Sequence, residues 1–291
     1  MAALLAFVSA ICYGVSDFSG GLAARRVPAT AVVLASNALS LMLALLAVGL
    51  LPGSAFRAVD MLWGAAAGAV GLLGVVLLYR GLALGSMSVV APLTAVLSAL
   101  VPVAVGILRG DRPGTVAVIG VVLAFPAMVL IGRESRKRGQ SVAGIVGTAA
   151  PLSRRALASA LSAGLSFGGF YVLLAQTGPN GGAWPLVAQR AASVIIVLAL
   201  SAVAVMRGTP ALPQGRTLGL AAIAGITDFA ANLAYLLATH RGLLALVAVI
   251  SSLYPGTTLL LARGLLSERL ARQQGASLLL AAVAVALIAL H

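Results

Sequence analysis

The charged residues of this chain lie almost entirely in short gaps between long apolar runs. Charge-free runs include residues 27–56, 81–108 and 156–189, and 9% of the 291 residues are charged against 61% that are hydrophobic. The hydrocarbon core of a bilayer is about 30 Å thick, so a spanning helix needs roughly 20 apolar residues. Most of the runs reach that length. The pattern therefore predicts a protein that crosses a membrane many times.

The composition also excludes several classes of protein. The runs are apolar on all sides, which favours helices over the alternating strands of a barrel. The single cysteine, Cys12, excludes an internal disulfide and a zinc site. The sequence holds no nucleophile–His–acid set and no phosphate-binding loop, so we expect no catalysis, no cofactor, no metal and no ATP-driven pump. The net charge of +13 is typical of basic cytoplasmic loops, so we expect no nucleic-acid partner.

The apolar runs predict ten transmembrane helices. Their expected bounds are about residues 2–24, 29–51, 61–80, 86–108, 114–132, 156–176, 184–206, 217–238, 243–265 and 274–290. A weakly apolar stretch at 139–150 is too short to span and is interpreted as linker or as an interfacial segment.

The densest cluster of charge, at residues 133–155, divides these helices into five and five. We therefore predict two repeats, 1–132 and 156–291, joined by a basic linker. Segment 35–40 (ASNALS) matches 188–193 (AQRAAS) in order and spacing. The alternative is that Ala- and Leu-rich helices align by composition alone. An odd number of helices forces the two repeats into opposite orientations, as in many transporters. The expected fold class is an all-α integral membrane protein with ten transmembrane helices as two inverted five-helix repeats.

The basic residues also predict an orientation. Fourteen of the 19 Lys and Arg residues lie in the loops after the odd-numbered helices, and four lie on the other side. Because Lys and Arg accumulate in cytoplasmic loops, the linker is expected in the cytoplasm and both termini outside. The expected location is the cell (plasma) membrane.

Three charges fall inside predicted helices, at Asp17, Arg190 and Asp228. Charged groups at membrane depth are costly and usually face the bundle interior or a water-filled cavity. Asp228 lies near the middle of its helix, and Asn232 and Tyr235 follow at i+4 and i+7 on the same face. This face predicts a cavity lining. The alternative is hydrogen bonding between helices, worth about 1 kcal/mol or less per bond.

Asp17 and Arg190 each have two interpretations. Asp17, with Tyr13 one turn before it, is either a cavity residue or an interfacial carboxylate paired with Arg25 or Arg26. Arg190 either reaches the membrane surface along its own stem, or pairs with a buried carboxylate or an anionic group of a substrate.

Prolines inside predicted helices are a second indication of a site. Pro92, Pro102 and Pro255 each remove the hydrogen bond to the carbonyl four residues back, which is that of Ser251 for Pro255. Broken helices at matching places in two halves point to a transport site, so Pro92, Pro255 and Ser251 become candidates. The alternative is that these prolines serve packing alone.

Short motifs spread along the whole chain resemble the EamA-type members of the drug/metabolite transporter superfamily. They are 251–258 (SSLYPGTT) with 266–270 (LSERL), 13–18 (YGVSDF), 189–191 (QRA) and 90–94 (VAPLT). The resemblance implies ten helices arranged as five plus five and transport of small metabolites. Three positions depart from the family pattern: Ser267 stands where Gly is usual, Asp111-Arg112 replaces a Glu-Arg pair, and the first repeat has Asn37 where the second has Arg190. Asn37 therefore joins the candidates. The resemblance would also fit termini in the cytoplasm, against the charge count.

We therefore expect a secondary transporter that exports small metabolites, such as amino acids or drugs, by alternating access between the two repeats. A buried carboxylate can carry a proton, so Asp228 or Asp17 could couple transport to protons, and facilitated diffusion fits as well. The expected partners are a small-molecule substrate and the lipid bilayer, with the protein a monomer or homodimer. The alternative is a non-transporting membrane scaffold or a membrane-embedded lipid-modifying protein. Six acidic residues and no soluble appendage argue against that alternative.

Overall fold

Helices form the framework of the described part of the chain. The computed structural model describes residues 1–50, 55–84, 87–142, 154–206, 213–266 and 272–290. The helices in these ranges are α1 (Ala2–Ala24), α2 (Ala29–Leu50), α3 (Ala58–Leu84), α4 (Met87–Leu108), α5 (Thr115–Val142), α6 (Arg154–Leu174), α7 (Trp184–Met206), α8 (Arg216–Thr239), α9 (Leu244–Ser251), α10 (Tyr254–Leu266) and α11 (Arg272–Ala289), with a short 3₁₀ turn, η1, at Pro179–Gly181.

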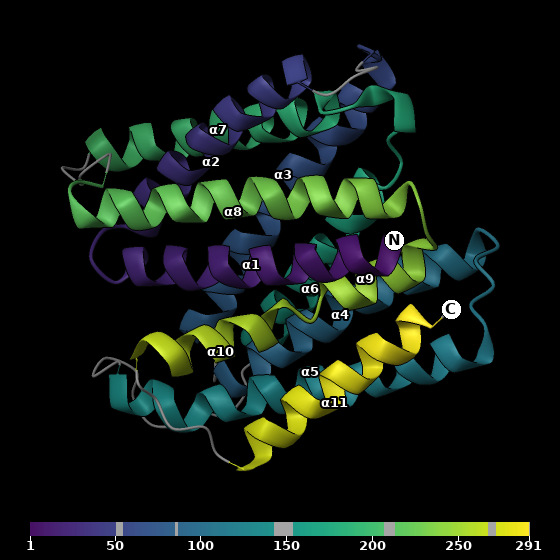
Figure 1. Cartoon of the computed structure of the whole chain (residues 1–291). Helices are drawn as coiled ribbons and strands as arrows, with labels where there is room; N and C mark the ends of the chain where they lie inside the picture. The colour runs from purple at the N-terminus through teal and green to yellow at the C-terminus, as the bar shows by residue number, and fades with distance from the viewer. Residues whose placement is uncertain (51–54, 85–86, 143–153, 207–212, 267–271, 291) are drawn as a thin grey trace.

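The helices lie roughly side by side in one elongated bundle (Figure 1). Successive helices run in opposite directions, except that α10 continues in the direction of α9, and both termini lie at one end, called here the terminal end. The other end carries the α1–α2 connection, residues 25–28, and is called the basic end. Within the described residues, six helices are long and apolar enough to cross a membrane, and four shorter apolar segments lie in α4, α5, α9–α10 and α11. The chain is therefore a multi-pass membrane protein.

The surface of the bundle is apolar and its interior is rich in small residues. Leucines such as Leu46 and Leu62 are 61% and 70% exposed, while Ala67 and Ala231 are fully buried. Lipid tails offer large apolar side chains the same environment as a protein core, so helix association in a membrane depends on close packing of small residues. The structure agrees with that rule: many of its buried residues are alanines, and many large apolar side chains are exposed on the outside of the bundle.

Glycines bring the central helices into backbone contact. Gly68 on α3 faces the main-chain carbonyl of Gln189 on α7, and a Cβ at this position would overlap it. Gly225 on α8 faces the main chain of Ser36 on α2 in the same way. Small residues at such crossings allow this approach. As a result α2, α3, α7 and α8 hold their polar residues within reach of one another.

Helix packing pairs elements that are far apart in the sequence. The helix α1 packs against α8, α3 against α6, and α2 against α7. The helix α4 packs against α6, while α9 and α10 pack against α1, and α5 pairs with α11. The N-terminal helix is thus enclosed by helices of the second half of the chain, as Figure 1 also shows.

Proline affects two helices differently. The expected break in the ninth span is confirmed: α9 ends at Ser251, and α10 begins at Tyr254 with Pro255 in its first turn, where a missing N–H is tolerated. The expected break in the fourth span is wrong, because α4 is continuous from Met87 to Leu108. Within a membrane helix, neighbouring groups can satisfy the one carbonyl that a proline frees.

The predicted bounds are otherwise close to those observed. The helices α1 and α7 begin and end where expected. The helix α5 continues past the predicted end at residue 132 to Val142, so the first part of the expected linker is helical. Residues 143–153 of the linker and 267–271, which hold Ser267 and Glu268 of the motif, lie outside the described residues.

Candidate functional site

A cavity of about 430 Å³ lies among the central helices. On α1 its lining begins at Tyr13 and continues to Ala24, and Ala29 at the start of α2 lines it as well. These last two residues flank the α1–α2 connection, so the cavity extends from the middle of the bundle toward the basic end. Its volume falls within the range of about 300–1,000 Å³ that is usual for small-molecule sites.

An ion pair between α7 and α8 forms part of the cavity wall. Arg190 Nη2 lies 2.5 Å from Asp228 Oδ2. The Arg190 Nη1 atom donates a hydrogen bond of 2.8 Å to Asn37 Oδ1 on α2. Arg190 is 6% exposed, so its charge is held inside the protein and does not reach the membrane surface. Of the two interpretations of Arg190, the structure therefore shows the pair with a buried carboxylate.

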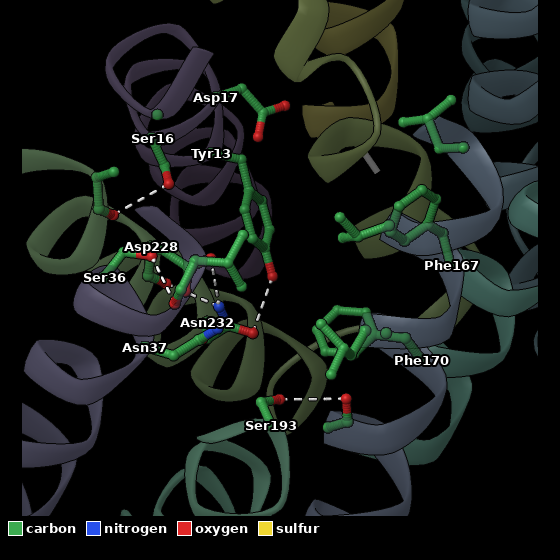
Figure 2. A pocket seen from close by; sticks show the side chains of 18 of the residues that line it. Tyr13, Ser16, Asp17, Ser36, Asn37, Phe167, Phe170, Ser193, Asp228 and Asn232 are labelled. Atoms are coloured by element: carbon green, nitrogen blue, oxygen red, sulfur yellow. Dashed lines mark hydrogen bonds between the residues drawn. The ribbon is translucent and has the colours of Figure 1, made fainter. Parts of the chain in front are cut away.

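Asn232 connects this ion pair to the opposite wall. Its Nδ2 atom donates a hydrogen bond of 2.7 Å to the main-chain oxygen of Asp228 and another of 3.3 Å to Asp228 Oδ1. Its Oδ1 atom accepts a hydrogen bond of 3.0 Å from the Tyr13 hydroxyl and one of 2.9 Å from Gln189 Nε2. Figure 2 shows Asn232 between Tyr13 and Asp228. One buried amide thus joins α1, α7 and α8, and a buried amide is stable only when its groups are paired in this way.

Asp17 has a different environment. Its side chain is exposed on the cavity wall, one turn above Tyr13 on α1. Within the described ranges, the Asp17 carboxylate makes no ion pair or hydrogen bond, and the expected alternative of a pair with Arg25 or Arg26 is not found. In Figure 2 the carboxylate points into open space across from Phe167. The cavity therefore contains one compensated and one uncompensated carboxylate.

Aromatic rings line the deep end of the cavity. The rings of Tyr13 and Tyr171 meet edge to face with centroids 6.3 Å apart, and those of Tyr13 and Tyr254 at 6.2 Å. Phe170 lies against Tyr171 at 5.3 Å and also lines the cavity. Behind them the fully buried Tyr235 donates a hydrogen bond to the Tyr171 main-chain oxygen at 3.0 Å. These rings separate the cavity from the terminal end.

Loops pack against one another at the terminal end. The Asp60 Oδ1 atom accepts a hydrogen bond of 2.9 Å from the Gly178 N–H. The Ala55 N–H donates to the Asn180 carbonyl at 3.0 Å. The α2–α3 connection is thereby attached to the α6–α7 connection.

A second pair of contacts joins other connections at the same end. The Asp111 Oδ2 atom accepts 3.0 Å from the Ala245 N–H at the start of α9, and His240 Nε2 lies 2.8 Å from the Thr177 carbonyl. In this structure the cavity therefore extends toward the basic end of the bundle, and the connections at the terminal end are joined by hydrogen bonds.

Six of the ten residues singled out from the sequence meet at the cavity. They are Tyr13, Asp17, Asn37, Arg190, Asp228 and Asn232. Three others lie outside its lining: Tyr235 and Ser251 are fully buried behind it, and Pro255 is on α10 next to the lining residue Tyr254. The side chain of Pro92 is outside the described part of the structure.

The sequence reasoning missed several lining residues. Phe167, Phe170 and Tyr171 line the cavity from α6, and Gln189 lines it from α7. The first three occur at i, i+3 and i+4, which places them on one helical face, and that spacing could have indicated a shared aromatic wall. Among the described residues, no group of three or more His, Cys, Asp or Glu side chains could hold a metal ion.

Comparison with known proteins agrees with this architecture. A family model described as the EamA-like transporter family matches residues 1–133 and 154–290. No curated protein matches the chain. A solved structure, described only as the crystal structure of a protein, is similar to this chain with a TM-score of 0.73 and 18% sequence identity, over 99% of this chain and 96% of its own. That likeness concerns the fold alone.

Proposed function

The chain belongs to the EamA-like transporter family, and from this premise we propose that it is a secondary transporter that moves a small molecule through the central cavity. The observation that carries the proposal is the cavity itself. It lies at the middle of a membrane-spanning bundle, extends toward one end, and is separated from the other end by aromatic rings and joined loops. A site of this form is what alternating access requires.

We further propose ten transmembrane helices in two inverted repeats, on either side of the linker at 133–155. Helix packing supports the repeat. If α1 corresponds to α6, α3 to α8, and α4 to α9 and α10, then the α1–α8 contact corresponds to the α6–α3 contact. The contact of α1 with α9 and α10 then corresponds to that of α6 with α4. Asn37 and Arg190, at matching positions of the aligned segments, hydrogen-bond to each other, as residues close to a two-fold axis would. The site then lies where transporters of this class hold substrate, between the repeats.

The proposed direction is export from the cytoplasm across the cell membrane. The α1–α2 connection, which holds Arg25 and Arg26, is one of the loops expected in the cytoplasm because of their Lys and Arg content, and it lies at the basic end. The cavity extends toward that end, which is the conformation in which an exporter takes up its substrate. Protons carried by Asp228 or Asp17 would drive the step, and facilitated diffusion is the alternative. Accumulation against a gradient when a pH difference is imposed distinguishes the two.

Filling the cavity should stop transport without unfolding the protein. Ser36 lines the cavity from α2, and its hydroxyl donates a hydrogen bond to the Val33 carbonyl of its own helix. We expect Ser36→Trp to lower substrate flux into proteoliposomes at least tenfold, because an indole would occupy the substrate's space. The matched control is Met42→Trp on the lipid-facing side of α2, where the native residue is 61% exposed. Equal flux in the two variants would show that substrate does not pass through this cavity.

A further inference from the structure

The charges around the cavity do not cancel. Its described lining contains two carboxylates, Asp17 and Asp228, and one basic side chain, Arg190. Arg190 is already engaged, with Nη2 on Asp228 and Nη1 on Asn37. One negative charge, that of Asp17, therefore remains without a partner on the wall. A ligand with a positive group would supply the missing charge.

Three hydroxyl groups on the wall donate their hydrogen bonds to protein acceptors. The hydroxyl of Ser16 donates to the Ala224 carbonyl at 3.0 Å and that of Ser193 to the Gly68 carbonyl at 3.2 Å. The Tyr13 hydroxyl donates to Asn232. A carboxylate or phosphate on a ligand needs charged or converging donors. These three donors are already used, and Arg190, the one charged donor of the described lining, is paired with Asp228. The wall therefore offers an anionic group no unpaired cationic donor among the described residues.

Aromatic faces surround the space in front of Asp17. The lining includes five aromatic side chains, those of Tyr13, Phe167, Phe170, Tyr171 and Tyr254. The rings of Tyr13 and Tyr171 are in contact, as are those of Phe170 and Tyr171. Figure 2 shows Asp17 and Tyr13 facing the open space that Phe167 and Phe170 border from across it. Aromatic rings attract organic cations through their quadrupole and also pack against apolar groups. A carboxylate together with several rings matches a cation that has an apolar body.

We propose that the substrate of this cavity is a singly charged organic cation with an aromatic or aliphatic body, and that the Asp17 carboxylate is its counter-ion. The proposal rests on the transport function argued above and names the substrate class for the same site. In this arrangement the Asp228–Arg190 pair positions the wall and does not bind the charge of the substrate. Amino acids fit less well, because their carboxylate has no free cationic partner among the described lining residues.

Three ligands that share a phenyl group on a short carbon chain test how binding depends on the charge of the ligand. Phenethylamine is a cation, and phenylalanine is the zwitterion formed by adding a carboxylate to it. The third ligand, 3-phenylpropionate, keeps the carboxylate of phenylalanine but lacks the amine, so it is an anion. Binding to the purified, detergent-solubilised protein is measured by calorimetry and by thermal shift. Benzyltrimethylammonium serves as a second cation, and its uncharged carbon analogue, neopentylbenzene, as the neutral control. We expect both cations to bind at least tenfold more tightly than the zwitterion, the anion and the neutral analogue.

The matched variants are Asp17→Asn and Asp17→Glu. We expect Asp17→Asn to weaken cation binding at least tenfold while leaving the melting temperature of the empty protein unchanged, because Asp17 has no partner to lose among the described residues. Asp17→Glu should retain cation binding. Three results would overturn the proposal. The first is equal cation binding by Asp17→Asn and the native chain, and the second is tighter binding of phenylalanine or 3-phenylpropionate than of the cations. The third is failure of both cations to bind. If flux of another substrate is still abolished by Ser36→Trp, the transport function stands and only the substrate class fails.

Discussion

Arg190→Met is expected to lower stability sharply and to abolish transport. The substitution leaves the Asp228 carboxylate without its counter-ion, and Asn37 without its donor. Breaking a buried ion pair on one side costs about 3–5 kcal/mol, and the lower part of this range applies because the Asp228 side chain is 24% exposed to the cavity. A loss of about 3 kcal/mol corresponds to a fall in melting temperature of roughly 6–12 °C in a protein of this size.

The double variant Arg190→Met/Asp228→Asn distinguishes the cost of leaving Asp228 unpaired from the effect of losing Arg190 itself. With both charges removed, no uncompensated carboxylate remains, so most of the lost melting temperature should return. Transport should not return, because the Asn37–Arg190 link between the two halves is still missing. A single Arg190→Met variant as stable as the native protein would show that the pair is not a structural element of the cavity wall.

Joining the two connections at the terminal end is expected to stop transport completely and reversibly. Ala55 and Asn180 are both exposed and their main chains are hydrogen-bonded at 3.0 Å. In a Cys12→Ala background, Ala55→Cys and Asn180→Cys can be linked by a short, reducible thiol cross-linker. Substrate should still bind from the basic end, but flux should fall to background, because the terminal end cannot open.

Two single-cysteine variants are the controls for this experiment. Ala55→Cys alone and Asn180→Cys alone, treated with the same reagent, should transport normally, and reduction should restore flux to the linked protein. Full transport by protein that is completely cross-linked would mean that the terminal end does not move during transport.

The sequence predicted the membrane helices well because their ends coincide with charge and with turn residues. The Arg25-Arg26 pair ends α1 where the apolar run ends, and Gly178 to Gly182 separates α6 from α7. Pro255 marked the α9–α10 break. The continuity of α4 could not be read from its prolines, because whether one freed carbonyl breaks a helix depends on neighbouring helices that the sequence does not place.

The candidate site was predicted in part. Charges inside apolar runs must face away from lipid, and this rule brought Asp17, Arg190 and Asp228 to the same cavity. The partners of these charges were not predictable. The helices are apolar on nearly every face, so hydropathy does not fix how each is rotated, and rotation decides whether Arg190 meets Asp228 or Asp17. For the same reason, the α6 face that carries Phe167 and Phe170 was not recognised.

The central claim is that one cavity opens in turn to each side of the membrane. A single thiol at Ser36→Cys, in the Cys12→Ala background, reports this directly, because Ser36 lines the cavity. In proteoliposomes of known orientation, a membrane-impermeant thiol reagent is added from one side at a time during substrate turnover. Labelling from both sides is predicted, with labelling from the terminal side abolished when residues 55 and 180 are cross-linked as above. Labelling from the basic side alone, whatever the substrate, would contradict the account.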